Sequence, residues 1–262
     1  MATQIIDSPV GLSQPLLGIP MKIGDYFHAH SFRKSEVGGL MNPLLMFDHF
    51  WMKRDTFGWH SHSGISAVTY VFEDSKSAHY NADSMGDNSP INPGSLHWMV
   101  AGSGAMHRER PEGDDALVHA LQFFVDLPEE SKSVHPYLVH LDADNVPEVI
   151  QDGACIRVVA GQFGGVRSPV VLPQPFSLYD MLLCERKPLK VPLPANWGTW
   201  LYVVRGEATV AIDGRTRILE QNHAVALNTG SVGRVASIQG EGRTQVVVLA
   251  GAIIPHAKAT AQ

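Results

Sequence analysis

The chain has 262 residues and a net charge of −6, with 44% hydrophobic and 18% charged residues. This balance is typical of a globular protein with one large β domain or two smaller ones. Lysine and arginine are dispersed, which argues against a nucleic-acid-binding face. No apolar run approaches the roughly twenty residues of a membrane helix, and no secretory signal is evident in residues 1–18. We therefore expect a cytoplasmic protein that binds neither nucleic acid directly nor a membrane.

Short apolar or β-branched runs alternate with glycine- and proline-containing turns along the chain. The clearest runs lie at 67–72, 120–125, 156–160, 201–204 and 245–249. Many short strands separated by turns predict an all-β fold of the sandwich or barrel type. Helical periodicity is nearly absent, and we expect short helices only around 128–134 and 144–151.

The two halves of the chain repeat one order of segments: an aromatic strand, a turn, a second strand and a polar turn. The first copy begins near Val68 and the second near Trp200. This repeat predicts two β-barrels in tandem, one over residues 1–135 and one over residues 136–262. Where the first half carries histidines before its aromatic strand, the second half has Gly198 and Thr199. Any metal site is therefore expected in the first half alone.

Two short strings contain the residues with the clearest chemistry. His60 and His62 are two positions apart, and so are His107 and Glu109. In a strand, residues at i and i+2 project to the same face, so two neighbouring strands would bring three imidazoles and one carboxylate together. Mixed nitrogen and oxygen ligation with open positions is what Fe(II) and related divalent metals use in oxygen chemistry. Arg108, between two of these residues, should point away from the metal.

These strings resemble the motifs of the pirin family of the cupin superfamily, and the likeness spans about residues 20–255. It is carried by 60–62 with 68–70, 92–94, 98–104 and 107–109, and by flanking strings at 48–50, 119–128, 136–137, 157–161 and 201–206. The resemblance implies two tandem cupin barrels of the jelly-roll type. It implies one divalent metal in the N-terminal barrel, held by His60, His62, His107 and Glu109, while the C-terminal barrel lacks metal ligands.

Four positions depart from the usual pirin pattern, and one of them is Arg108, which stands where the residue is usually small. Ser63 and Ser66 stand where the family has charged residues, and a supporting ion pair or hydrogen bond is expected to be missing there. His97 stands where a pirin usually has glutamine. These changes bear on the identity of the substrate more than on metal binding.

The resemblance implies a metal-dependent dioxygenase of the quercetin 2,3-dioxygenase type, acting on a flavonol or another aromatic enol. Iron(II) is the metal implied, and the donor set also suits Mn, Co, Ni, Cu or Zn. Glu109 is the candidate catalytic residue, either as a ligand or as the base that accepts the enol proton. The alternatives are a non-catalytic redox- or metal-responsive protein that modulates a partner such as a transcription regulator, and a purely structural metal site.

Overall fold

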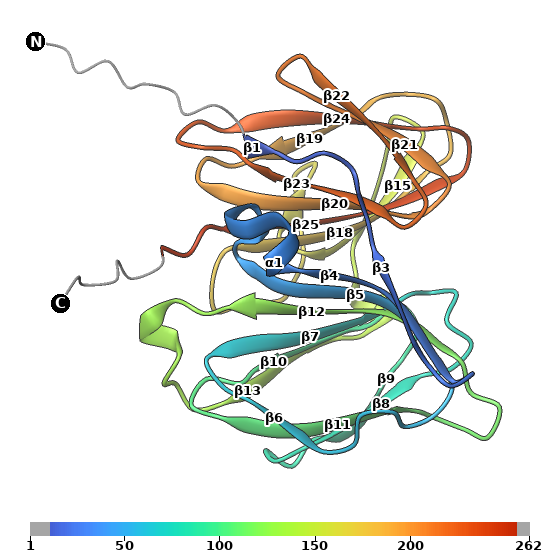
Figure 1. Ribbon diagram of the computed structural model, residues 1–262, viewed down its shortest axis with the longest axis vertical. Coiled ribbons are helices and arrows are strands. Elements are labelled where there is room, and N and C mark those ends of the chain that lie inside the picture. The colour runs from blue at the N-terminus through green and yellow to red at the C-terminus, as the bar shows by residue number, and fades with distance from the viewer. Residues whose placement is uncertain (1–10, 256–262) are drawn as a thin grey trace, which may run out of the picture.

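The computed structural model describes residues 11–255, and it consists mainly of strands arranged as two stacked halves (Figure 1). Part of the N-terminal stretch examined for a secretory signal, residues 1–10, lies outside this range. Each half combines one large sheet with one four-stranded sheet, and the two large sheets face each other across the middle of the molecule. The expected all-β fold with two tandem barrels is confirmed.

The first half contains a seven-stranded sheet and a four-stranded sheet, both antiparallel. In sheet order the larger one contains β13 (Tyr137–Leu141), β10 (Leu96–Val100), β7 (Ile65–Val71), β12 (Val118–Asp126), β5 (Leu44–Met52), β4 (Phe27–Arg33) and β3 (Ile19–Ile23). The smaller one contains β6 (His60–His62), β11 (Ala105–Pro111), β8 (His79–Asp83) and β9 (Asn88–Ile91).

The second half repeats this plan with an eight-stranded sheet and a four-stranded sheet. The larger contains β1 (Gly11–Leu12), β23 (His223–Asn228), β20 (Trp197–Arg205), β25 (Thr244–Ala252), β18 (Phe176–Leu183), β15 (Ala154–Ala160) and β14 (Glu148–Gln151), with β2 (Leu16–Leu17) also paired to β23. The smaller contains β19 (Leu189–Leu193), β24 (Arg234–Gly240), β21 (Glu207–Ile212) and β22 (Arg215–Glu220), and β16 (Gln162–Phe163) pairs with β17 (Val166–Arg167).

In the part of the chain that the structure describes, helical structure is limited to single turns. These are α1 (Lys34–Val37) and the 3₁₀ turns η1 (Gly38–Met41), η2 (Glu129–Ser131) and η3 (Ala143–Asn145). Within residues 11–255, no helix has the length and apolar character needed to cross a membrane.

The helix expected over residues 144–151 is wrong. A single 3₁₀ turn ends at Asn145, and residues 148–151 form strand β14. Exposed and half-buried side chains alternate along β14, and Val149 lies opposite Ile156 of β15. A period of two suits a strand, so pairing with β15 decides the conformation of this segment. The helix expected around 128–134 is reduced to the 3₁₀ turn η2.

Each half contributes strands to the large sheet of the other half. β13 begins after residue 135 but pairs with β10 of the first half, whereas β1 and β2 pair with β23 of the second. These exchanged strands hold the two halves together in addition to the face-to-face packing of the large sheets. The division into units 1–135 and 136–262 stays a prediction.

The largest buried cluster lies between the two large sheets. Trp98 and Phe123 from the first half pack against Phe176 of the second, and Phe32 packs against Trp200. Burying several large aromatic rings stabilises this interface, since each contributes on the order of 2–3 kcal/mol of hydrophobic free energy. The interface therefore holds the first barrel, which contains the candidate site, against the second barrel.

Candidate metal centre

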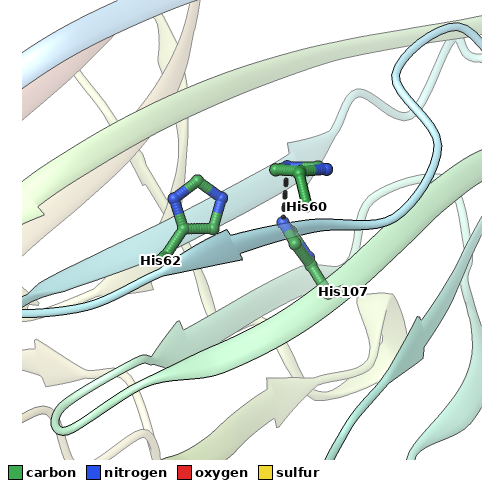
Figure 2. A group of neighbouring side chains, drawn as sticks. All are labelled: His60, His62 and His107. Atoms are coloured by element: carbon green, nitrogen blue, oxygen red, sulfur yellow. Dashed lines mark hydrogen bonds between the residues drawn. The ribbon is translucent and has the colours of Figure 1, made fainter.

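The three histidines expected to bind metal do come together, on the paired strands β6 and β11 (Figure 2). His60 lies directly opposite His107 in this antiparallel pair, and His62 follows two residues later on the same face. One ring nitrogen from each histidine lies within 4.8 Å of the others. Three imidazole nitrogens gathered in this way are a donor set that could hold a divalent metal ion.

The turn after β10 delivers His107 to this position. Gly102 has φ +48°, a backbone conformation that residues with a Cβ rarely adopt, and its carbonyl accepts a hydrogen bond from the backbone N–H of Gly64 at 2.8 Å. A Cβ at Gly102 would also overlap the carbonyl oxygen of Val134. Glycine is therefore required here, and the turn ties the start of β11 to the end of β6.

Burial favours the neutral form of two of the three imidazoles, and hydrogen bonds orient the third. Nδ1 of His60 donates to the carbonyl oxygen of Gly58 at 3.0 Å, which leaves its Nε2 as the acceptor, and this atom lies 3.1 Å from Nε2 of His107. Burial, followed by the neighbouring His107 and His60, lowers the pKa of His62 to about 4. Burial also lowers the pKa of His107. Neutral imidazole is the form that binds a metal ion.

Glu109 lies two residues beyond His107 on the same face of β11, and it is 7% exposed. Its carboxylate accepts hydrogen bonds from Oγ1 of Thr69 at 2.7 Å and from Nε2 of Gln122 at 3.3 Å. Nε2 of His79 lies 3.8 Å away.

Burial opposes ionisation of Glu109, but the electrostatic interactions with His107, His79 and His97 and the hydrogen bond from Thr69 together outweigh it. Together they bring the pKa of Glu109 to about 2. Glu109 is therefore a fixed, ionised carboxylate beside the histidines, and its role as a ligand stays a prediction.

A cavity of about 280 Å³ opens beside these residues. It is lined by Met21, Arg33, Met46, Asp48, Met52, Phe57, His60, His62, His79, Glu109, Gln122 and Phe124. Most of the wall is apolar, and Arg33 and Asp48 form an ion pair at 2.6 Å within it. This combination of an apolar wall with a few fixed polar groups is usual for a small-molecule site.

His79 and Gln122 are site residues that the sequence analysis missed. Gln122 donates a hydrogen bond to Glu109, and Nε2 of the fully buried His79 lies 3.8 Å from the carboxylate. Neither residue has the i, i+2 spacing that identified the predicted ligands. His79 approaches Glu109 from β8, and Gln122 approaches it from β12. The sequence held one signal for these two site residues, which was the alternation of inward- and outward-facing side chains along those strands.

The positions that depart from the pirin pattern lie outside the cavity wall. Ser63 is exposed, and Ser66 is buried on the side of β7 that faces the second half. Nε of Arg108 donates to Oδ2 of Asp55 at 2.5 Å, and its side chain does not line the cavity, as expected from its place between two inward-facing residues. The serines therefore change the surroundings of the site and leave its donor set intact.

Comparison with known proteins agrees with the geometry. The family model for pirin matches residues 20–125. The chain is 30% identical to human pirin over 212 residues, which cover 80% of this chain and 72% of the human protein.

Solved structures with a similar fold include a bacterial pirin and a quercetin 2,3-dioxygenase. A Geobacillus kaustophilus protein is 23% identical with a TM-score of 0.84, covering 95% of this chain and 98% of its own. Quercetin 2,3-dioxygenase from Acinetobacter baumannii is 23% identical with a TM-score of 0.78, covering 93% and 86%. A bacterial pirin from Escherichia coli, solved with nickel(II), is 19% identical with a TM-score of 0.68, covering 94% and 100%. The fold is thus that of the cupin superfamily, and the chain belongs to the pirin family.

Proposed function

We propose that the protein is a metal-dependent dioxygenase that acts on a flavonol or a related aromatic enol. The observation that carries this proposal is the convergence of His60, His62 and His107 beside a buried, ionised Glu109 at an apolar cavity. The likeness in fold to a bacterial quercetin 2,3-dioxygenase and to a pirin with nickel(II) supports it. Iron(II) is the metal we propose, and the cytoplasm is the compartment.

The three imidazoles and Glu109 fit a divalent metal. When bound, the metal would act as a Lewis acid that favours the anion of an enol hydroxyl and would activate dioxygen. Glu109 is already ionised, so it can either join the ligands or accept the enol proton. Its hydrogen bonds from Thr69 and Gln122 fix the carboxylate in one orientation for either role.

The cavity walls suit a flat aromatic substrate. Phe124 packs edge-on against the ring of His62, with ring centroids 4.8 Å apart, so a ring entering the cavity would contact both. Phe57 is 49% exposed and packs edge-on against Phe27, which places an aromatic side chain at the cavity's open side. These rings would hold a substrate by apolar contact and exclude water from the reacting face.

The test is oxygen uptake by protein loaded anaerobically with iron(II), using quercetin as the substrate. We expect oxygen consumption matched by loss of quercetin in the wild type. His62→Ala should lose the iron and the activity, and Glu109→Gln should lower kcat by about 10²–10⁴-fold. His223→Ala, a matched control in the second half, should keep the wild-type rate. Iron-loaded wild type that consumes no oxygen with quercetin or with related enols would overturn the proposal.

A further inference from the structure

A second group of metal-capable side chains lies inside the first barrel. Asp83 ends β8, Asp87 lies in the turn that leads to β9, and His97 belongs to β10 of the opposite sheet. Each offers one possible ligand atom, and these atoms lie within 4.8 Å of one another. The group therefore joins the two sheets of the barrel, and it shares no residue with the three-histidine group on β6 and β11.

His97 is buried without a hydrogen-bond partner. It is 2% exposed, and among the described residues neither of its ring nitrogens has a partner. Its strand neighbours Leu96 and Trp98 belong to the core between the two halves, so His97 faces the opposite way, into the first barrel. Burying an unpaired polar ring destabilises the fold, so an imidazole close to two carboxylates points to a ligand between them.

The two carboxylates are held in position by their own hydrogen bonds. Oδ1 of Asp83 accepts from the backbone N–H groups of Met85 at 2.8 Å and Asp87 at 3.1 Å. Asp87 accepts from the hydroxyl of Ser89 at 2.9 Å. Within residues 11–255, no ion pair joins either carboxylate to a lysine or an arginine. Two carboxylates this close repel each other unless a cation lies between them.

Asn81 adds a fourth possible donor. It is fully buried, its Nδ2 donates to Oδ2 of Asp87 at 2.8 Å, and its Oδ1 has no hydrogen-bond partner among the described residues. Rotating the amide by 180° would turn the oxygen toward the carboxylates, where a cation would bind it. Two carboxylates, one imidazole and one amide oxygen then surround the same point.

We propose that Asp83, Asp87 and His97 form a second site for a divalent transition-metal ion, with Asn81 completing it. The imidazole favours Zn²⁺, Mn²⁺ or Fe²⁺ over Mg²⁺ and Ca²⁺, which prefer oxygen ligands. Bound there, the ion links the β8–β9 hairpin to β10 and neutralises the buried carboxylate of Asp83 and the half-buried one of Asp87, so its effect is to stabilise the first barrel. This site goes beyond the proposed oxygenase activity and does not depend on it.

The two groups are neighbours, because Asp83 lies opposite His107 in the β8–β11 pair. The experiment must therefore remove the first group. We would measure zinc binding by equilibrium dialysis and elemental analysis in the full-length chain carrying His60→Ala and His62→Ala. About one equivalent of zinc should remain in this double variant, against about two in the wild type. Adding His97→Gln or Asp87→Asn should abolish the remaining equivalent.

His140→Gln is the matched control, since His140 lies opposite His97 on β13 but is exposed. It should leave zinc binding unchanged. A double variant that binds no zinc where the wild type binds one equivalent would overturn the second site, and so would unchanged binding after His97→Gln.

Thermal unfolding provides a second measurement on the same proteins. Zinc should raise the Tm of the double variant, and it should not raise the Tm after Asp87→Asn, a change that keeps the side chain's size. An equal rise in both would also contradict the site. Because none of these readouts involves oxygen or quercetin, failure of the oxygenase proposal would leave their result intact.

Discussion

Asp180 is a buried carboxylate at the contact between the two halves, and its protonation should control part of the protein's stability. It lies on β18 and is 5% exposed. Its oxygens accept hydrogen bonds from the hydroxyl of Tyr70 at 3.0 Å and from Nε2 of Gln245 at 2.9 Å. Burial raises the pKa of Asp180 to about 6, although both hydrogen bonds act in the opposite direction.

The sign of the effect follows from this raised pKa. The folded protein binds the Asp180 proton more tightly than the unfolded chain, whose pKa is near 3.8. Folding is therefore penalised once Asp180 is ionised: the penalty is absent below about pH 4 and is complete above about pH 6. A difference of about two pH units between the two pKa values corresponds to a penalty of about 3 kcal/mol in the free energy of unfolding.

Asp180→Asn removes this penalty at every pH. We expect the stability of the variant relative to wild type to increase by about 3 kcal/mol between pH 4 and pH 7.5, on top of a constant offset from the changed hydrogen bonds to Tyr70 and Gln245. The assay is urea unfolding at four pH values in that range, with EDTA present. Asp144→Asn, the same charge change at an exposed position, should follow the wild-type curve. Parallel curves for wild type and Asp180→Asn would refute the reasoning.

Two further predictions concern single contacts that hold the barrels. Gly102→Ala should cost about 2 kcal/mol more than Gly214→Ala in urea unfolding, because both glycines have positive φ but only at Gly102 would the Cβ overlap a carbonyl oxygen, that of Val134. Equal costs would contradict the overlap. Tyr202→Phe should lower the free energy of unfolding by about 1–3 kcal/mol. The Tyr202 hydroxyl lies 2.6 Å from Nδ1 of the buried His49, and this nitrogen would lose its partner. A change below about 0.5 kcal/mol would show that His49 finds another partner.

The sequence predicted the histidine group because its geometry is local. His60 and His62 share a strand face whatever the rest of the fold does, and so do His107 and Glu109. Only the pairing of β6 with β11 had to be inferred, and the flanking glycine turns indicated it. The strands were predictable for the same reason, because the side chains of a strand alternate with a period of two that is visible in its own sequence.

The second group could not be predicted, because its members meet only through the fold. Asp83 and Asp87 are four residues apart, and this spacing places ligands together only because a turn reverses the chain between β8 and β9. His97 comes from the opposite sheet, so its approach depends on how the two sheets of the barrel close. The exchange of β13 between halves escaped prediction likewise, because non-local pairing leaves no periodic signal.

The two barrels differ in what fills them, and this difference agrees with the proposal that places the metal site in the first. The interior of the second barrel is an apolar cluster that includes Leu201, Val203 and Val225. Gly198, which stands in the sequence where the first half carries its histidine pair, packs so closely against the carbonyl of Asn42 that a Cβ would overlap it. That position is therefore used for contact between the halves and has no room for a ligand.

The interior of the first barrel includes buried polar atoms that have no hydrogen-bond partner among the described residues. Among them are ring nitrogens of His62, His79, His97 and His107 and Oδ1 of Asn81. Such atoms destabilise a fold unless something binds them, and each of these side chains can offer a lone pair to a cation. The wide aromatic interface with the second barrel offsets that cost. The stability supplied by packing against the second barrel, which has an apolar core, therefore allows the first barrel to keep a polar interior suited to metal ions.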